Sequence, residues 1–155
     1  MSKSVKRVAR VLAEAGLPDT IIEPGESRTA ELAAAACGCE LDQIVKSIIF
    51  AGEDSGAIRL FLTAGGNRIC ADKASRLAGE TLGRADAALV RATTGFAIGG
   101  VAPVGHLTPS PTWIDTRLLD FGLVWAAAGT PRHVFSIAPD QLITLAGALP
   151  ADFVE

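Results

Sequence analysis

The chain has 155 residues, of which 49% are hydrophobic and 20% charged, a composition that is ordinary for one globular domain spanning residues 1–155 and excludes wholesale disorder. Its formal net charge of -3 disfavours the phosphate-binding surface that long duplexes require, so we expect no DNA partner, whereas a short contact with one nucleic-acid end stays open. No apolar run is long enough to cross a bilayer, so no membrane partner is expected either.

Helical spacing of apolar residues predicts a first helix over residues 3–16, ended by Gly16 and Pro18. No apolar block or small-residue cleavage site follows its basic residues, so we expect mature protein rather than a signal peptide. Four cations share the opposite face, and a solvated face and a phosphate-tracking face both stay open for them: Lys3, Lys6, Arg7 and Arg10.

A short strand is predicted over residues 20–23, and a helix capped by Ser27 or Thr29 follows it. The next segment, Cys37-Gly38-Cys39, has two of the chain's three cysteines, a number and spacing that suit neither a disulfide framework nor a zinc site. We therefore expect a reducing, cytoplasmic location with no metal and no cofactor.

Residues 40–45 are predicted to form another short helix, followed by a hairpin of strands 47–51 and 58–64. Lys46 stands at this junction, and two interpretations stay open. On a strand it shares a face with Ile48 and Phe50, where a buried lysine needs an anion or polar ligand; at a helix C-terminus it is favoured by the dipole.

The second half of the chain alternates helices, loops and short strands. Paired glycines in the loop 95–110 allow main-chain N–H groups to point at an oxygen, although for Gly-Gly alone a simple tight turn is the favoured explanation. The remaining predicted elements are a helix from Asp72 to Leu77, a helix over 86–94, a strand over 112–115 with a helical turn to Leu119, a hairpin of strands 123–127 and 133–137, and a helix over 139–146. Strands that arrive in hairpins favour an α+β fold with a mixed, largely antiparallel sheet.

Common catalytic motifs are missing from the sequence. It has no GxSxG elbow, P-loop, HExxH or GxGxxG, and its two histidines, His106 and His133, form no recognisable triad. Asp115 ends a predicted strand, where it either orients a ligand or caps the next helix.

Taken in order, several short segments resemble the YbaK/EbsC-type aminoacyl-tRNA deacylases, which are related to the editing domain of bacterial prolyl-tRNA synthetases. The matching segments are Ser27–Ala33, Gln43–Ser47, Asp72-Lys73, Thr94-Gly95-Phe96, Gly99–Gly105, Pro111–Asp115 and Gly129. The resemblance implies a curved or barrel-like sheet flanked by helices. It also implies a freestanding enzyme that hydrolyses the ester between a wrong amino acid and the tRNA 3′ end.

By this resemblance Lys46 interacts with the tRNA 3′ end, and the N–H groups of Gly99 and Gly100 hold the ester carbonyl. The terminal ribose hydroxyl would assist water, which explains why no triad is needed. Asp115 would orient the site and His133 would shape amino-acid selection. The other expected substrate-binding positions are Ser27, Thr29, Ile48, Phe50, Val101, Ala102, Pro103, Gly105, His106 and Gly129.

The expected substrate is a prolyl tRNA carrying a small amino acid such as alanine or 2-aminobutyrate. Cysteinyl-type members tend to have serine where this chain has Ala102, which argues against cysteine. The expected partners are the tRNA acceptor end and prolyl-tRNA synthetase. The alternative is a non-catalytic module on the same fold that binds the tRNA 3′ end or a small molecule.

Overall fold

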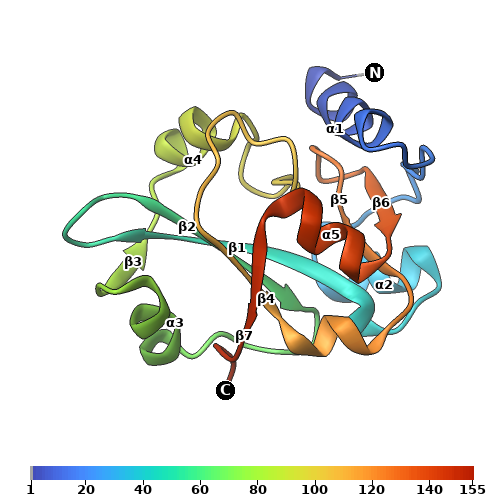
Figure 1. Cartoon of the computed structure of the whole chain (residues 1–155). Coiled ribbons are helices and arrows are strands. Elements are labelled where there is room, and N and C mark those ends of the chain that lie inside the picture. Colours follow the sequence, from blue (N-terminus) through green and yellow to red (C-terminus); the bar gives the residue numbers. More distant parts are fainter. Residues whose placement is uncertain (1) are drawn as a thin grey trace.

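In the computed structural model, which describes residues 2–155, the chain folds around one long hairpin (Figure 1). Its strands are β1 (Ile44–Gly52) and β2 (Ile58–Ala64), which pair antiparallel from Val45 with Ala64 to Ala51 with Ile58. Both strands are rich in β-branched and aromatic residues, and a polar Gly-rich loop joins them, as the sequence predicted.

Five shorter strands complete a seven-stranded sheet, whose main path runs β6-β5-β1-β2-β4-β7, with β3 also pairing with β1. Antiparallel residue pairs outnumber parallel ones, which confirms the expected mixed, largely antiparallel sheet. The added strands are β3 (Leu82–Arg84), β4 (Thr112–Asp115), β5 (Val124–Ala127), β6 (Val134–Ile137) and β7 (Ala148–Ala151).

Five α-helices surround the sheet, and Figure 1 shows α1 above the β5–β6 end and α5 against the middle of the sheet. Side-chain caps fix several helix starts: the hydroxyls of Ser2 and Thr29 and the carboxylate of Asp86 accept from main-chain N–H groups. The helices are α1 (Lys3–Glu14), α2 (Ala30–Cys37), α3 (Ala71–Ala78), α4 (Ala87–Thr94) and α5 (Pro139–Ala146), with 3-10 turns η1 (Leu41–Gln43) and η2 (Thr116–Asp120). No helix within residues 2–155 has both the length and the apolar character of a membrane span.

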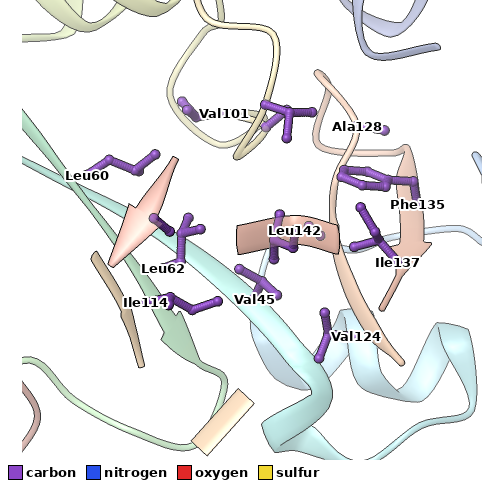
Figure 2. Packing of buried hydrophobic residues seen from close by; sticks show 14 of the residues in the cluster. Val45, Leu60, Leu62, Val101, Ile114, Val124, Ala128, Phe135, Ile137 and Leu142 are labelled. Carbon is purple, nitrogen blue, oxygen red and sulfur yellow. The ribbon is translucent and has the colours of Figure 1, made fainter. Parts of the chain in front are cut away.

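The two faces of the hairpin bury different clusters, because successive side chains of a strand point to opposite sides. One face carries Val45, Leu60 and Leu62 into the main core, where Phe135 and Leu142 meet them (Figure 2). The opposite face packs Ile48 and Phe50 against a second cluster built of Phe61, Ala74, Trp113 and Phe153. Phe61 stacks on Trp113 with ring centroids 5.0 Å apart.

Three sequence predictions about local structure are wrong. Residues 40–45 form only the 3-10 turn η1, closed by a capping box between Glu40 and Gln43, after which Ile44 already belongs to β1 because it pairs with β5. Residues 20–23 form no strand, and only Ile22 makes an isolated bridge, to Val134. Helix α3 begins one residue before Asp72, so Cys70 rather than Asp72 is its N-cap.

Candidate functional site

A cavity of about 410 Å³, within the size range of ligand pockets, lies along residues 44–49 of β1. Four segments that are distant in sequence form its walls: the start of α2, β1, α4 with the residues around it, and β5 with the β5–β6 turn and the start of β6. Predicted site residues at the cavity are Ser27, Thr29, Lys46, Ile48, Gly99, Val101 and His133. The fold therefore brings together seven of the residues that the sequence singled out.

Lys46 is a strand residue, which decides between the two interpretations of its position. It shares a face with Ile48 and Phe50, it is one of the residues that line the cavity, and its Nζ donates to the main-chain oxygen of Asn67 at 2.6 Å. The cation is thus held by a neutral carbonyl, which leaves its charge available to an anionic or polar ligand.

Asp115 is only 3% exposed and does not line the cavity, but it supports the turn that holds Lys46. Its Oδ2 accepts from the main-chain N–H of Ala64 at 3.0 Å and from Nδ2 of Asn67 at 2.9 Å. Its Oδ1 accepts from the N–H of Arg117 at 3.0 Å, which caps η2. Asp115 therefore both caps a helical turn and anchors Asn67, the residue whose carbonyl binds Lys46.

The two adjacent glycines of the 95–106 loop, Gly99 and Gly100, occupy different places. Gly99 lines the cavity and has a φ of +96°, which only glycine adopts without strain. Gly100 is buried behind it, where a Cβ atom would come 2.7 Å from Cα of Thr130. The N–H of Gly100 donates to the carbonyl of Ala97 at 3.1 Å, so this group is engaged within the loop.

At the rim of the cavity, both ring nitrogens of His133 have neighbours. Nδ1 lies 2.6 Å from Oγ1 of Thr130, and Nε2 lies 3.6 Å from a carboxylate oxygen of Glu23. The hydroxyls of Ser27 and Thr29 are also engaged, since the first donates to the Pro131 carbonyl at 2.7 Å and the second caps α2. These three residues therefore shape the rim through contacts within the protein.

The remaining predicted substrate-binding residues lie outside the cavity, apart from Gly100 and Asp115 described above. They pack into the second core cluster, into the folded 95–106 loop or against α1: Phe50, Ala102, Pro103, Gly105, His106 and Gly129. His106 illustrates the reason, because its Nε2 donates to the Ala102 carbonyl at 2.6 Å, and burial lowers the pKa of the ring below its ordinary value. Ala102 itself is fully buried, so the argument against cysteine from this position loses its structural basis.

Among the residues of this site that sequence reasoning missed, three contribute polar groups near Lys46 or His133. Ser47 and Thr130 line the cavity, and Asn67 provides the carbonyl that holds Lys46. Extending the predicted strand back from Ser47 to Ile44 could have shown that Ser47 lies inside a continuous strand and not at its start. Nothing in the sequence indicates the role of Asn67, because a main-chain oxygen makes its contact.

The described residues contain no group of three His, Cys, Asp or Glu side chains able to hold a metal ion. Burial raises the pKa of the Cys37 thiol to about 11, with the neighbouring charge of Cys39 adding to it, so this thiol stays protonated at neutral pH.

Comparison with known families decides the identity. Residues 25–145 match the model of the aminoacyl-tRNA editing domain. The chain belongs to this family. Membership confirms the resemblance stated from the sequence, and it makes this editing domain an aminoacyl-tRNA deacylase.

Relatives of this editing domain are found among curated proteins and solved structures. It is 32% identical to the "Uncharacterized protein YwhH" of Bacillus subtilis over 75% of this chain and 73% of that protein. It is 25% identical to the "Putative Cys-tRNA(Pro)/Cys-tRNA(Cys) deacylase EbsC" of Enterococcus faecalis over 76% of this chain and 71% of that one. A crystal structure described as "a putative trans-editing enzyme for prolyl tRNA synthetase" superposes with a TM-score of 0.91 at 47% identity, covering 100% of this chain and 99% of the other.

Proposed function

We propose that this editing domain acts in trans on a prolyl tRNA that carries a wrong, small amino acid, and hydrolyses the ester at the 3′-terminal adenosine. The observation that carries the proposal is the cavity, which joins Lys46, Gly99 and His133 in a space of about 410 Å³. The similarity to the structure described as a trans-editing enzyme supports the choice of tRNA.

The residues that line the cavity favour a substrate whose amino acid has a small, apolar side chain. Val45, Ile49, Val90 and Val101 come from β1, α4 and the glycine loop, and none of them offers a polar group. A pocket of this kind separates substrates by size, and one methylene is worth only about 1–3 kcal/mol. Alanine and 2-aminobutyrate fit this description, and cysteine is retained as a test substrate because Ala102 does not line the cavity.

The chemistry needs positioning and oxyanion donors rather than a protein base. Water attacks the carbonyl carbon of the ester, and the resulting oxyanion is held by the main-chain N–H of Gly99, because the N–H of Gly100 is engaged within the loop. The terminal ribose hydroxyl assists the transfer of the proton from water to the leaving ribose oxygen. Lys46 binds the 3′ end of the tRNA and fixes the ester against the loop.

The test is a deacylation panel. Prolyl tRNA charged with alanine, 2-aminobutyrate, serine, cysteine or proline is incubated with the protein, and loss of the ester is followed over time. We expect rapid loss of one or two small residues with proline spared. No loss from any of these, nor from alanyl, seryl and threonyl tRNAs, would favour the non-catalytic binding module.

Lys46→Ala tests the site itself. We expect at least a tenfold loss of the deacylation rate with little change in unfolding, because Lys46 makes a single hydrogen bond within the protein. Lys73→Ala is the matched control, since Lys73 pairs with Asp152 at 3.0 Å and lies outside the cavity. Equal activity of wild type and Lys46→Ala on every substrate would remove Lys46 from the site.

A further inference from the structure

One edge of β1 is only partly covered. Strand β2 covers the first edge from Val45 to Ala51, whereas on the second edge β5 pairs only with Ile44 and Val45 and β3 pairs only from Phe50 onward. Within residues 2–155 no strand pairs with the second edge between these two contacts, and the cavity lies along this gap. The gap therefore exposes main-chain groups of a central strand to a ligand.

The hydrogen bonds at the end of β1 identify these groups. The N–H of Gly52 donates to Ala57 on the β2 side, and the N–H of Glu53 donates to Thr81 on the β3 side. Successive residues of a strand alternate in the direction of their main-chain groups. Counting back along the unbroken register with β2, Ser47 and Ile49 direct their N–H and C=O groups into the gap.

Ser47 adds a polar side chain at the same place. Its Oγ is buried and has no hydrogen-bond partner in the described part of the chain. A buried hydroxyl without a partner costs free energy, and such a group calls for a physical explanation. Rotation about χ1 lets a serine hydroxyl turn toward a ligand that enters beside it.

We propose that the aminoacyl group of the substrate binds in this gap as a single added strand residue, paired with the main chain of Ser47 or Ile49 and completed by the Ser47 hydroxyl. This inference rests on the proposed function. An aminoacyl ester carries an α-amino donor and a carbonyl acceptor on neighbouring atoms, the same pair that one strand residue offers to an edge. The α-amino group donates to a β1 carbonyl, and the ester carbonyl accepts from a β1 N–H with one lone pair while its second lone pair faces the N–H of Gly99.

This binding mode explains how a small apolar pocket can recognise an amino acid. The main chain of β1 reads the groups that every amino acid shares, while the apolar walls limit the side chain. It also predicts that the α-amino group contributes to binding, which a purely hydrophobic pocket does not require.

The main-chain part is tested with two non-hydrolysable probes, 3′-deoxy-3′-(L-alanylamino)adenosine and the propionylamino analogue that lacks the α-amino group. Amide hydrogen exchange is followed by NMR in the full chain. We expect the alanyl probe to slow exchange of the Ser47 or Ile49 amide and to bind about tenfold more tightly than the propionyl probe, as one charge-assisted hydrogen bond implies. Binding that protects neither amide, or equal affinity for the two probes, would overturn the inference.

Ser47→Ala tests the hydroxyl, with Ser47→Thr as the variant that retains it and Ser136→Ala on β6 as the control outside this cavity. We expect Ser47→Ala to bind the alanyl probe about five- to tenfold more weakly. Its stability should be unchanged or higher, because the hydroxyl that it loses has no partner. If wild type and Ser47→Ala bind the alanyl probe equally well, or if Ser47→Ala loses stability but keeps its affinity for the probe, Ser47 has a structural role only.

These outcomes separate this inference from the proposed function. If wild type deacylates its tRNA but neither amide is protected by the alanyl probe, the strand-edge binding mode fails and the function stands. If the amides are protected but no tRNA is deacylated, the binding mode stands and the proposed hydrolysis fails. Failure of the alanyl probe to bind wild type overturns the binding mode, whatever the deacylation panel shows.

Discussion

Lys46 is held in place by a chain of contacts that starts at a buried carboxylate. Asp115 binds the side chain of Asn67, and the carbonyl of Asn67 binds the Lys46 ammonium at 2.6 Å. The same carboxylate also binds the N–H of Ala64 next to the turn. A lysine with four rotatable bonds loses much of its freedom in such an arrangement before the substrate arrives.

We predict that Asp115→Asn lowers deacylation through Lys46. The amide that replaces one carboxylate oxygen cannot accept, so at least one buried N–H loses its partner, at a cost of about 1–3 kcal/mol in the free energy of unfolding. The measurement is a double-mutant cycle on the deacylation rate, with Lys46→Ala as the second change. We expect Asp115→Asn to have little further effect once Lys46 is absent.

The control for this cycle is Asp120→Asn, which removes a surface partner of Arg117 at 2.8 Å and leaves Asn67 alone. It should change neither stability nor rate by much, because exposed ion pairs contribute little. Undiminished deacylation by folded Asp115→Asn would show that Asp115 is structural only.

At the residue scale, the sequence predicted several site residues whose chemistry depends on the side chain or on glycine, but it missed the hydroxyls of Ser47 and Thr130. Lys46, Gly99 and His133 were predicted and line the cavity. His106 was predicted at the site but lies outside the cavity. The sequence of a loop does not show that the ring of His106 will donate to the carbonyl of Ala102, four residues earlier. Contacts made through the main chain, such as that of Asn67, have no side-chain signature.

At the element scale, α1 fastens the loop that carries Gly99. The guanidinium of Arg7 donates to the carbonyls of Thr94 at 3.2 Å, Gly95 at 3.5 Å and Gly105 at 3.5 Å. It also lies 4.8 Å from the ring centroid of Phe96. Of the four cations on this helix, Arg7 thus belongs to neither a solvated nor a phosphate-tracking face.

We predict that Arg7→Met weakens both the fold and the reaction. Methionine retains much of the apolar stem but donates to no carbonyl, so we expect a loss of about 1–3 kcal/mol in the free energy of unfolding. The deacylation rate should fall as well, because the loop at Gly99 loses its attachment at both ends. Urea unfolding and single-turnover deacylation at a temperature where the variant stays folded measure the two effects.

Arg10→Met on the exposed face of α1 is the control for stability, since no hydrogen bond or ion pair is found for Arg10 in the described residues. A rise in KM for tRNA in this variant, with stability unchanged, would show that the exposed part of the helix contacts phosphates. If Arg7→Met lowers stability without lowering the rate, α1 does not position the loop.

Two strands escaped the sequence analysis because their pairing, and not their composition, makes them strands. Strand β3 has three residues with a central Gly83, and β7 contains Pro150, both of which are unfavourable in isolated strands. Each gains its conformation from a partner, β1 for β3 and β4 for β7. The long hairpin, by contrast, was visible from its own residues.

At the scale of the whole molecule, the cavity is a product of topology. Its walls come from the start of α2, from β1, from α4 with the residues around it and from β5 with its turn, and they lie around the gap between β5 and β3. The family resemblance supplied the identities of several wall residues. Neither residue pattern nor resemblance could show that β1 has an uncovered edge, because that requires the lengths of both neighbouring strands.

The stability of the whole chain should depend on His106 below neutral pH. Burial is the largest cause that lowers the pKa of this ring, the charge of Arg7 adds to it, and the hydrogen bond to Ala102 opposes them. The folded state therefore binds a proton less readily than the unfolded chain, whose histidine titrates near 6.5. Stability is fully present above this value and falls as the pH drops toward the lower pKa of the folded state.

We predict that the free energy of unfolding, measured by urea titration between pH 8 and pH 5, falls in wild type and falls less in His106→Gln. Glutamine can still donate an N–H to the Ala102 carbonyl but takes up no proton in this range. His133→Gln, which removes the chain's other histidine, is the control and should retain the fall. Ser55 and Arg59 bind the carboxylate of Glu80 and lower its pKa to about 2. The stability that these contacts provide is lost only below about pH 4.5, outside this window. Identical pH profiles for wild type and His106→Gln would show that the buried ring is not the group that couples protonation to unfolding.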